Sequence, residues 1–514
     1  MISGTSALLL AASAAAAAPL DADVIIIGAG WAGMGAADYL ARHNFSSFLV
    51  LEASGRTGGR THALPAFGHD SVGKFVVERG SNWVQSTLGG AGANTKGAPN
   101  VRFNPMQLLA EKHNLHTTLI HGSTQNMSNY AAVYDADGVR ADLDGSLRAR
   151  ANAAYDCLNV TAQSAGTALS VREALTGCGW NPKSDVEWAV DWVLTVDDPG
   201  FPAELQEAQM TLPDESYEWW GNNDWFVIDQ SSPRGWARLL DEMVADWLRP
   251  GDPRLMLNAT VMNIGHGCAG ANVTLADGSV LRAKQVLSTL PLGVLQRNLS
   301  TLFTPPLPKQ HAEVIENDGI VMGNLTHVLY QFSSVWWDDS LPRWVSANKD
   351  ASQNQTLSGE FSEVQNLNHA SMIPGSQILL SFLGDPQSSL YEGMSDAGAQ
   401  AAAMERLRMQ HPKKTIPDPV AFFISRHGYD PLSYGAYSGF MPGFKDKFIA
   451  KMKEHLKSCG KVRVRFAGEA TCDDLGGYTH GGLQSGIEAA AHILHDAGLG
   501  PNPGHDDALS LCDW

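Results

Sequence analysis

The chain has 514 residues, of which 44% are hydrophobic and 18% charged, and its formal net charge is -18. This length allows roughly two to four globular domains with sizeable cores. The negative charge argues against a nucleic acid partner, because phosphate binding requires clustered Lys and Arg, and it is compatible with a cationic substrate.

The N-terminal segment MISGTSALLLAASAAAAAPL combines a short apolar run with small residues. That pattern is typical of a secretory signal peptide, which we place at residues 1–20. No later apolar run reaches the ~18 residues of a membrane-spanning helix, so no membrane association is predicted.

Eight Asn-x-Ser/Thr sequons also favour secretion, with glycans on some of them. They start at Asn44, Asn126, Asn159, Asn258, Asn272, Asn298, Asn324 and Asn354. Asn324 is expected in a core strand, where a glycan would not fit.

The six cysteines, at positions 157, 178, 268, 459, 472 and 512, include no Cys-x-x-Cys pair. No metal site is therefore predicted. One or two disulfides are expected, and Cys157 and Cys178 form a close pair in sequence.

A dinucleotide-binding unit is predicted near the N-terminus. A continuous apolar strand at Val24–Ile27 is followed by a Gly-x-Gly-x-x-Gly turn and a helix, and a second strand at Phe48–Leu51 ends at Glu52. The glycines permit the tight turn, the approach of a pyrophosphate and the packing of the helix on the strand, while the acid is placed to bond ribose hydroxyls. The three glycines are Gly28, Gly30 and Gly33.

Further motifs follow along the chain. They are EASGRTGGR at 52–60, ERGSNWVQS at 78–86, RGWARLLDEM at 234–243, STLPLGVLQ at 288–296 and FAGEATCDDLGGYTHGGLQSG at 466–486. Together they resemble the flavin-containing amine oxidases, and most of all the secreted polyamine oxidases of plants and fungi. The resemblance covers nearly the whole chain after the leader.

The resemblance implies that both glycine-rich turns hold one FAD. The first turn would grip the pyrophosphate and the adenosine, and the second would close over the ribityl chain and the flavin ring. The flavin should be non-covalent, because Ala436 stands where monoamine oxidases carry the tethering cysteine. The implied cofactor-binding residues are Gly28, Gly30, Gly33, Glu52, Arg56, Gly59, Arg60, Val261 (through its backbone, to the adenine), Glu469 and Tyr478.

The fold class is therefore α/β, with a discontinuous Rossmann-like FAD-binding domain interleaved with a mixed-sheet α+β substrate domain. An Asp-Gly pair at Asp277 and Gly278 predicts a hairpin in the middle of the FAD-binding domain. The predicted boundaries are 22–106, 246–310 and 455–500 for the FAD-binding domain, 107–245 and 311–454 for the substrate domain, and 501–514 for a C-terminal tail.

Between Ser184 and Pro233 the chain carries twelve acidic residues, no Lys or Arg, and several tryptophans. One interpretation is an acidic, aromatic mouth that attracts polyamine cations. The other is a solvated helix face with core tryptophans. The tryptophans are Trp188, Trp192, Trp219, Trp220 and Trp225.

Amine oxidation by a flavin requires a deprotonated amine held against the ring, so the protein mainly orients the substrate and excludes water. The resemblance implies that Tyr437 and Tyr478 wall the amine, and that Trp83 lines the channel leading to it. Two positions depart from the family pattern. One is Gln85, which replaces a channel glutamate of the plant enzymes. Asp198 is not a departure, since it loosely matches another channel acid.

The second departure is His327, in the predicted strand MGNLTHVLYQF, where the family has a lysine that holds a water beside the flavin. A neutral imidazole could hold that water and shuttle a proton near neutral pH, as a catalytic residue beside Tyr437 and Tyr478. The alternative is a buried, hydrogen-bonded and inert strand histidine.

The sequence thus predicts a secreted enzyme that oxidises spermine, spermidine or acetylated forms to an imine. Hydrolysis would give an aldehyde and an amine, and molecular oxygen would become hydrogen peroxide. Two alternatives stay open. One is an L-amino acid or other amine oxidase of the same fold, which needs an arginine paired with the substrate carboxylate. Arg343 and Arg426 lie in the predicted substrate domain, but neither is in a stretch that the resemblance places at the flavin. The other is a flavin-binding homologue that has lost catalysis. The bond cleaved and the oligomeric state are not determined.

Overall fold

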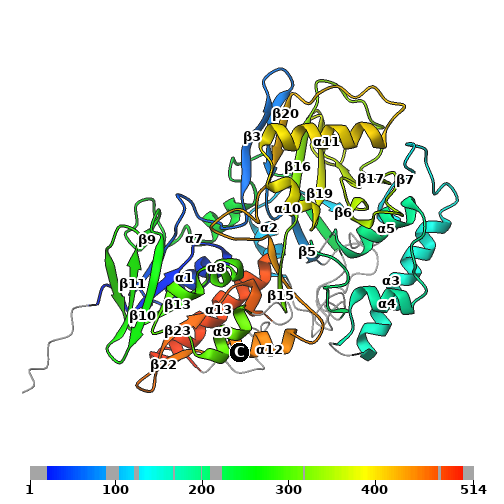
Figure 1. The fold of residues 1–514 in the computed structure, drawn as a ribbon. Coiled ribbons are helices and arrows are strands. Elements are labelled where there is room, and N and C mark those ends of the chain that lie inside the picture. The colour runs from blue at the N-terminus through cyan, green and yellow to red at the C-terminus, as the bar shows by residue number, and fades with distance from the viewer. Residues whose placement is uncertain are drawn as a thin grey trace, which may run out of the picture.

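The structure is a computed structural model that describes residues 20–87, 104–120, 127–165, 168–197, 199–208, 223–316, 319–472 and 476–501. Figure 1 shows two adjoining bodies, one around β13, α1 and α13 and the other around β16, β19 and α11. Among the described residues, no helix has both the length and the apolar character needed to traverse a bilayer.

The first body is built on a six-stranded sheet with the order β22-β23-β13-β1-β2-β9. Neighbouring strands are parallel except at the edge, where β22 runs antiparallel to β23. Its strands come from three widely separated parts of the chain, which confirms the discontinuous α/β fold; the exact domain boundaries stay a prediction. The strands are β1 (Val24–Ile27), β2 (Phe48–Leu51), β9 (Leu255–Met256), β13 (Gln285–Ser288), β22 (Leu456–Ser458) and β23 (Lys461–Phe466).

Strand β1 is apolar throughout because both of its faces are covered. Val24 and Ile26 join a core cluster with residues of α1 (Trp31–Arg42) and α13 (Thr479–Asp496). Ile25 and Ile27 join the opposite cluster, with residues of β10 (Val261–Gly267) and β11 (Gly270–Leu275). Burial on two sides is what a central parallel strand requires.

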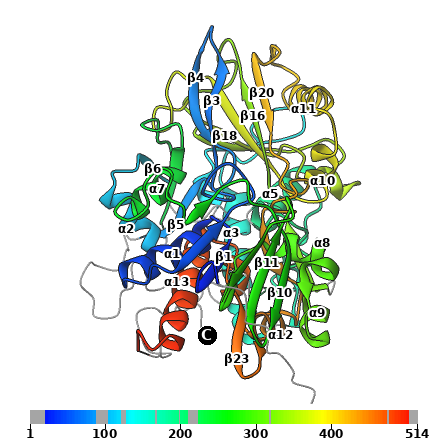
Figure 2. The ribbon, with the colours of Figure 1, turned by 90° about the vertical axis from the view of Figure 1, so that its left-hand side faces the viewer.

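Helices α1 and α13 lie side by side against this sheet (Figure 2). Glycines make the contact close: a Cβ at Gly486 would lie 1.9 Å from the carbonyl oxygen of Ala32, and one at Gly35 would lie 2.6 Å from Leu483. The helix of the first glycine turn and the helix of the last are therefore locked together.

The second body contains a six-stranded sheet with the order β20-β16-β19-β18-β17-β7, antiparallel except for the β17–β7 pair. Leu329 and Leu380 on one face cluster with α3 (Ser146–Ala165) and α5 (Asp185–Thr195). The other face clusters with α11 (Asp396–Gln410). The strands are β7 (Ala132–Tyr134), β16 (Thr326–Gln331), β17 (Arg343–Ser346), β18 (Glu363–Asn366), β19 (Ile378–Leu383) and β20 (Ala421–Ile424).

The predicted strand from Met322 to Phe332 is wrong as a single element. It is two strands in two sheets: β15 (Ile320–Gly323) pairs with β21 (Tyr437–Phe440), and β16 joins the large sheet. The chain turns at Asn324, which is buried between the strands and whose N–H donates to the carbonyl of Gly200. The expectation that Asn324 is too buried for a glycan agrees with its 3% exposure.

The remaining elements are smaller. The hairpin predicted at Asp277 and Gly278 joins β11 to β12 and is confirmed. The other strands are β3 (Ala63–His69), β4 (Gly73–Glu78), β5 (Trp83–Thr87), β6 (Thr117–Ile120), β8 (Asn223–Val227), β12 (Val280–Ala283) and β14 (Phe303–Thr304). The other helices are α2 (Pro105–Lys112), α4 (Val171–Gly177), α7 (Arg238–Val244), α8 (Leu292–Leu302), α9 (Lys309–Glu316), α10 (Gln387–Glu392) and α12 (Lys445–Met452).

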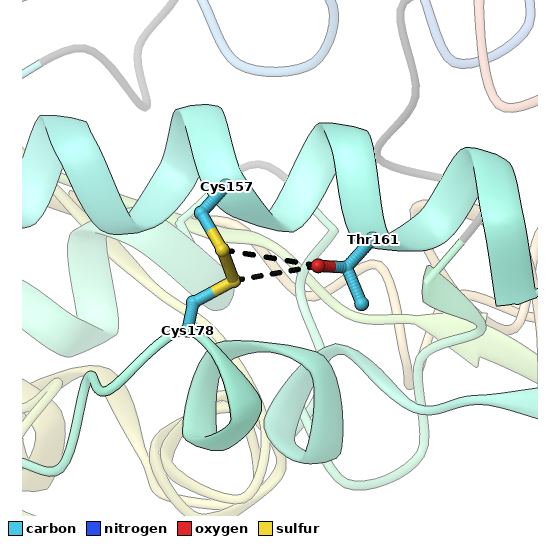
Figure 3. The surroundings of a disulfide bond; sticks show 3 residues. All are labelled: Cys157, Thr161 and Cys178. Carbon is cyan, nitrogen blue, oxygen red and sulfur yellow. Dashed lines mark hydrogen bonds between the residues drawn. A yellow bond between two sulfur atoms is a disulfide. The ribbon is translucent and has the colours of Figure 1, made fainter.

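Disulfides tie distant parts of the chain. The predicted pair is confirmed: Cys157 on α3 bonds Cys178 after α4, and the hydroxyl of Thr161 lies 3.8 and 3.5 Å from the two sulfurs (Figure 3). Cys268 bonds Cys459 across a sequence separation of 191 residues. Cys472 is disulfide-bonded as well, which makes a third disulfide, so the expectation of one or two was too low. No group of His, Cys, Asp and Glu in the described ranges is arranged to hold a metal.

Candidate cofactor and active site

The first glycine turn has the conformation that its sequence predicts. Gly28 has φ +104° and donates its N–H to the carbonyl of Leu51 at 2.7 Å, which joins the ends of β1 and β2. A Cβ at Gly33 would lie 1.9 Å from the carbonyl oxygen of Gly28. Only glycine therefore lets α1 begin this close to the strand.

The loop that contains Gly58 and Gly59 packs directly on the first glycine turn. The N–H of Gly58 donates to the carbonyl of Ala29 at 2.8 Å, and a Cβ at Gly59 would come within 3.3 Å of the Cα of Gly30. Gly30 is the N-cap of α1 and offers no capping side chain. The two bare backbones thus face each other at a helix N-terminus, a place that favours a phosphate group.

Positive charge collects around these loops. Burial lowers the pKa of Arg56, and the nearby Arg234 and Arg79 lower it further against the opposing effect of Glu52. Burial and the same arginines lower the pKa of His62 to about 3. Like charges gathered in a chain of net charge -18 fit an anionic ligand such as a pyrophosphate.

The predicted ribose acid is buried at the end of β2. Glu52 accepts the N–H of Ala29 at 2.8 Å on Oε2, and its Oε1 accepts the N–H and hydroxyl of Ser54 at 2.8 and 2.7 Å. Each carboxylate oxygen has two lone pairs, so Oε2 retains one for a ribose hydroxyl. The predicted adenine contact, Val261, begins β10 two residues after Ala259, whose N–H donates to the carbonyl of Glu52 at 2.8 Å.

The C-terminal turn meets the loop that ends at Arg60 around a cavity lined by Arg60, residues 288–292 and residues 466–471. Arg60 and Glu469 form an ion pair at its wall, with 3.0 Å between Nη1 and Oε1. Ser288 also lines the cavity, and its buried hydroxyl has no hydrogen-bond partner in the part of the chain that the structure describes. A buried hydroxyl without a partner beside an ion pair fits a polar ligand such as a ribityl chain.

The two predicted wall tyrosines adjoin this ion pair. Tyr437 begins β21, and Tyr478 is the N-cap of α13 with its ring stacked on His480 at 5.1 Å between centroids. Ser438 and Gly477, their chain neighbours, both donate to Oε2 of Glu469. The structure therefore brings together the two segments that carry these tyrosines, which are 41 positions apart in sequence (478 − 437).

His327 lies buried in β16 at 4% exposure, with its ring 5.0 Å from that of Phe382 and 6.4 Å from that of His427. Burial lowers its pKa to about 3, although a hydrogen bond to the backbone of Glu78 opposes the shift. Nδ1 has no partner among the described residues. The imidazole is therefore neutral at physiological pH, which fits the holding of a water but not the predicted shuttling of a proton near pH 7.

The predicted channel residues lie on β5. Trp83 and Gln85 alternate with the buried Val84, and the indole of Trp83 packs edge-on against Phe226 at 4.9 Å. The guanidinium of Arg343 lies 5.8 Å from the centre of the Trp83 ring. Asp198 falls outside the described residues.

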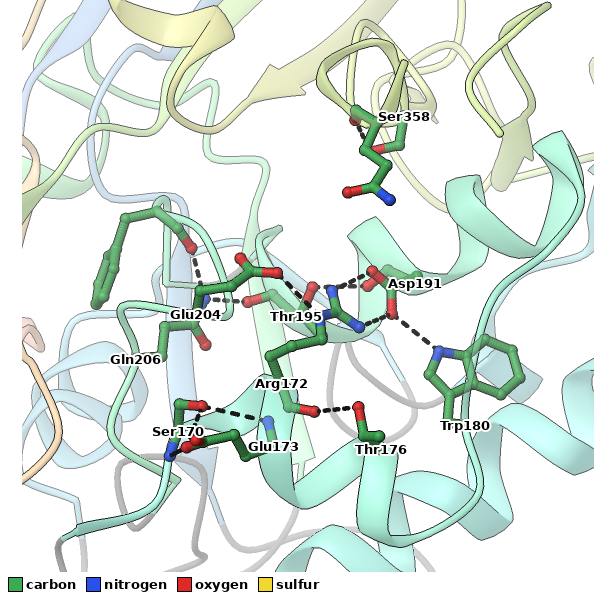
Figure 4. A network of polar contacts seen from close by, with 12 residues as sticks. Ser170, Arg172, Glu173, Thr176, Trp180, Asp191, Thr195, Glu204, Gln206 and Ser358 are labelled. Atoms are coloured by element: carbon green, nitrogen blue, oxygen red, sulfur yellow. Dashed lines mark hydrogen bonds and ion pairs between the residues drawn. The ribbon is translucent and has the colours of Figure 1, made fainter. Parts of the chain in front are cut away.

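In its described part, the acidic tryptophan-rich stretch is mostly structural. Asp191 accepts two hydrogen bonds from Arg172 at 2.7 and 2.6 Å and one from Trp180 at 2.9 Å, and Glu204 also contacts Arg172 (Figure 4). Asp229 pairs with Arg238 at 2.6 Å. These carboxylates are neutralised by arginines from outside the stretch, and Trp192 is a core residue at 3% exposure. Trp219 and Trp220 lie outside the described residues.

Comparison with known proteins identifies the family. Residues 31–494 match the model described as flavin containing amine oxidoreductase. The chain belongs to this family. Membership implies a flavin, FAD, and the two facing glycines, the arginine cluster and the polar cavity fit that group.

Relatives of this flavin amine oxidoreductase match along nearly its full length. Polyamine oxidase 1 of Zea mays is 26% identical over 504 residues, which cover 96% of this chain and 94% of the relative. Polyamine oxidase 7 of Oryza sativa subsp. japonica is 26% identical, covering 91% and 93%. A solved structure of putrescine oxidase bound to putrescine shares the fold, with a TM-score of 0.67 at 18% identity over 93% of this chain and 99% of that one.

Sequence reasoning missed several residues of this site. Arg79 and His427 were not singled out, because their role depends on neighbours far away in sequence. His427 donates Nε2–H to the carbonyl of Arg79 at 3.1 Å. Ser288 lies inside the quoted motif STLPLGVLQ, so that motif could have pointed to it.

Proposed function

We propose that this protein uses FAD to oxidise polyamines, such as spermine, spermidine or their acetylated forms, with oxygen as electron acceptor. The observation that carries the proposal is the pair Tyr437 and Tyr478, held by one carboxylate at the end of the cofactor cradle. Near full-length similarity to plant polyamine oxidases supports the same substrate class. The products would be an aldehyde, an amine and hydrogen peroxide.

When bound, FAD supplies the two-electron acceptor that takes hydride from the carbon beside the amine nitrogen and passes the electrons to oxygen. The chain holds FAD without a covalent bond, because Ala436 provides no tethering sulfur. Gly28, Gly30 and the Arg56 loop would hold the pyrophosphate, while Arg60 and Glu469 would hold the ribityl side.

The side chains around the reacting amine orient it and exclude water. The tyrosine faces would wall a deprotonated amine, and the apolar surroundings would favour its neutral form. His327, itself neutral, would hold an ordered water through Nδ1 without adding a charge that repels a polyamine.

An L-amino acid oxidase is disfavoured by the two arginines that it would need. Arg343 is 2% exposed and contacts Glu363 at 3.2 Å and the hydroxyl of Tyr130 at 2.7 Å. Arg426 contacts Asp396 at 2.6 Å and the carbonyl of Glu392 at 3.1 Å. Nε and Nη2 of Arg343 are used by the chain, as are Nε and Nη2 of Arg426, so neither guanidinium presents a free two-donor fork to a substrate carboxylate.

The test is hydrogen peroxide release by the FAD-loaded protein against spermine, spermidine, N-acetylated polyamines, benzylamine and L-amino acids. Anaerobic bleaching of the flavin is followed with the same panel. We expect rapid bleaching by a polyamine and none by amino acids. Bleaching by amino acids alone would favour the alternative oxidase, and no bleaching by any amine would leave only a flavin-binding role.

Secretion with N-glycans is part of the same proposal. The leader sequence, the disulfides and the surface exposure of several sequon asparagines support it. The exposed asparagines are Asn44, Asn258, Asn272, Asn298 and Asn354. Expression in a eukaryotic secretory host should give protein in the medium that loses mass on treatment with an N-glycosidase; retention in the cell would contradict the proposal.

A further inference from the structure

One ion pair joins the two ends of the chain at the active site. Arg60 directly follows Gly58 and Gly59, Glu469 follows β23, and the two residues are 409 positions apart. Their side chains are 24% and 7% exposed, and Nη1 of Arg60 lies 3.0 Å from Oε1 of Glu469. At this burial the pair is less screened than a surface salt bridge and can fix a geometry.

The same two side chains hold the backbone on both sides of Tyr437. Nη1 of Arg60 donates to the carbonyl of Ala436 at 2.8 Å. The hydroxyl of Ser438 donates to Oε2 of Glu469 at 2.6 Å, and the N–H of Ser438 approaches the same oxygen at 3.4 Å. Tyr437 thus sits between two residues that are each tied to one member of the ion pair.

Glu469 also holds the residue before Tyr478. The N–H of Gly477 donates to Oε2 at 2.9 Å, with Gly477 in the left-handed region at φ +86°. A Cβ at Gly477 would lie 3.9 Å from the Cβ of Tyr437, so the two tyrosine-bearing segments are in contact at this point. One carboxylate oxygen therefore sets the spacing between them.

The lone pairs of Glu469 separate this role from cofactor binding. Oε2 is filled by the hydroxyl of Ser438 and the N–H of Gly477, while Arg60 is the only donor to Oε1 among the described residues. Because each oxygen has two lone pairs, Oε1 retains one for a cofactor hydroxyl, and Oε2 serves the tyrosine segments alone.

We propose that the Arg60–Glu469 ion pair is a positioning clamp that sets the separation and orientation of Tyr437 and Tyr478. The clamp rests on the proposed function for its use, since the spacing of the tyrosines would select and orient the amine. Ser438 reaches Glu469 through Oε2, so it does not use the lone pair that Oε1 keeps for the cofactor.

The test compares Ser438→Ala with Ser376→Ala in the FAD-loaded protein. Ser376 is equally buried, and its hydroxyl has no partner among the described residues, so it is a matched control. Hydrogen–deuterium exchange is measured at residues 436–439 and 477–480. We expect exchange to rise about tenfold at both segments in Ser438→Ala and not in the control, because the lost hydrogen bond is to a charged group.

Exchange is read without any amine, so its result is independent of whether the protein oxidises polyamines. The FAD dissociation constant of Ser438→Ala should stay within about twofold of the wild type, while KM for the amine rises about tenfold. Unchanged exchange at both segments would overturn the clamp. Loss of FAD by Ser438→Ala would overturn it too, because Ser438 would then act through the cofactor.

Glu469→Gln is a second variant that keeps an acceptor oxygen but removes the charge that Arg60 requires. Exchange should rise at residues 436–439 and 477–480, and the FAD dissociation constant should rise about tenfold as well. If Glu469→Gln weakened FAD while both segments exchanged as in the wild type, Glu469 would be a cofactor ligand only and the clamp would be wrong.

Discussion

His327 is the position where the family resemblance predicts a lysine, so a change of charge is expected there. Its imidazole is neutral and packs against Phe382. Nδ1 has no partner among the described residues, so strand β16 carries a hydrogen-bond acceptor here and not a cation. The hydroxyl of Thr326, beside His327, donates to Glu392 at 2.6 Å, and the N–H of Gly428, beside His427, donates to the same carboxylate at 2.8 Å. These bonds hold the segments that carry both histidines. The position is thus rigid and uncharged.

Replacing this histidine tests its role. His327→Ala should lower the rate of flavin reduction by at least about tenfold, because the held water is lost. The pH profile between 5 and 8 should keep its shape, since a pKa of about 3 gives no titration in that range. Stopped-flow reduction by a polyamine measures both. His411→Ala, at another buried histidine, is the control, and equal rates in all three proteins would make His327 a bystander.

Glu78 gives a pH dependence of stability. Burial raises the pKa of the Glu78 carboxyl to about 8. The carboxylate accepts the N–H of Trp236 at 2.6 Å, and this hydrogen bond opposes the shift because it favours the charged form. A raised pKa means that stability is full below the unfolded value of 4.5 and is lost as pH rises toward 8.

Glu78→Gln removes this titration but keeps an acceptor for Trp236. Between pH 6.5 and 8.5 the wild type should therefore lose more stability than the variant. Urea unfolding at both pH values measures the difference. A constant gap between the two proteins across this range would contradict the assignment.

At the scale of elements, Gly30 and Gly33 of the first turn have different roles. A side chain at Gly33 would strike the carbonyl oxygen of Gly28, whereas one at Gly30 would meet only the Cα of Gly59, at 3.9 Å. One glycine is needed for the fold and the other for the ligand.

Two alanine substitutions separate these roles. Gly33→Ala should destabilise the protein by more than about 3 kcal/mol, because a backbone atom must move. Gly30→Ala should leave the thermal stability of the apoprotein unchanged but weaken FAD binding by at least about tenfold. Calorimetry and flavin titration check the pair; weakened FAD binding in neither variant would show that the cradle is elsewhere.

Sequence reasoning succeeded where the signal is local. Strand β1, α1, β2 and the hairpin at Gly278 follow from short-range patterns, and the motif residues of both glycine turns come together in space. It failed at Asn324, where the chain leaves one sheet for another because of contacts with Gly200. It also missed Ser438 and Arg79, whose importance arises only from partners distant in sequence: Glu469 lies 31 positions from Ser438, and His427 lies 348 positions from Arg79.

At the scale of the molecule, two disulfides close loops of very different length. The Cys268–Cys459 bond spans 191 residues and the Cys157–Cys178 bond spans 21. Loop-entropy arguments predict stabilisation of about 5 and about 3 kcal/mol respectively. Urea unfolding of the paired Cys→Ser variants should show the larger loss for the long loop, and the reverse order would contradict this reasoning.

Several buried histidines make the whole protein sensitive to acid. Burial lowers the pKa to about 3 for His327 and His480, and to about 4 for His311, His411 and His427. A lowered pKa gives stability that is present above the unfolded value of 6.5 and is lost as pH falls.

The melting temperature should therefore fall steadily from pH 7 to pH 5. Each buried histidine contributes up to about 1.4 kcal/mol per pH unit below 6.5. Differential scanning calorimetry across this range measures the slope. A flat melting temperature would mean that these imidazoles become charged without unfolding.

The strand order of the cofactor sheet has a consequence for biosynthesis. Strand β13 pairs with β1 on one edge and with β23 on the other, and β23 is made only after residue 460 has left the ribosome. Until then the hydrogen-bonding edge of β13 is bare, and neither Glu469 nor α13 exists to finish the nucleotide pocket. Flavin loading is consequently a late event, because the pocket cannot be completed before β23, Glu469 and α13 have been synthesised.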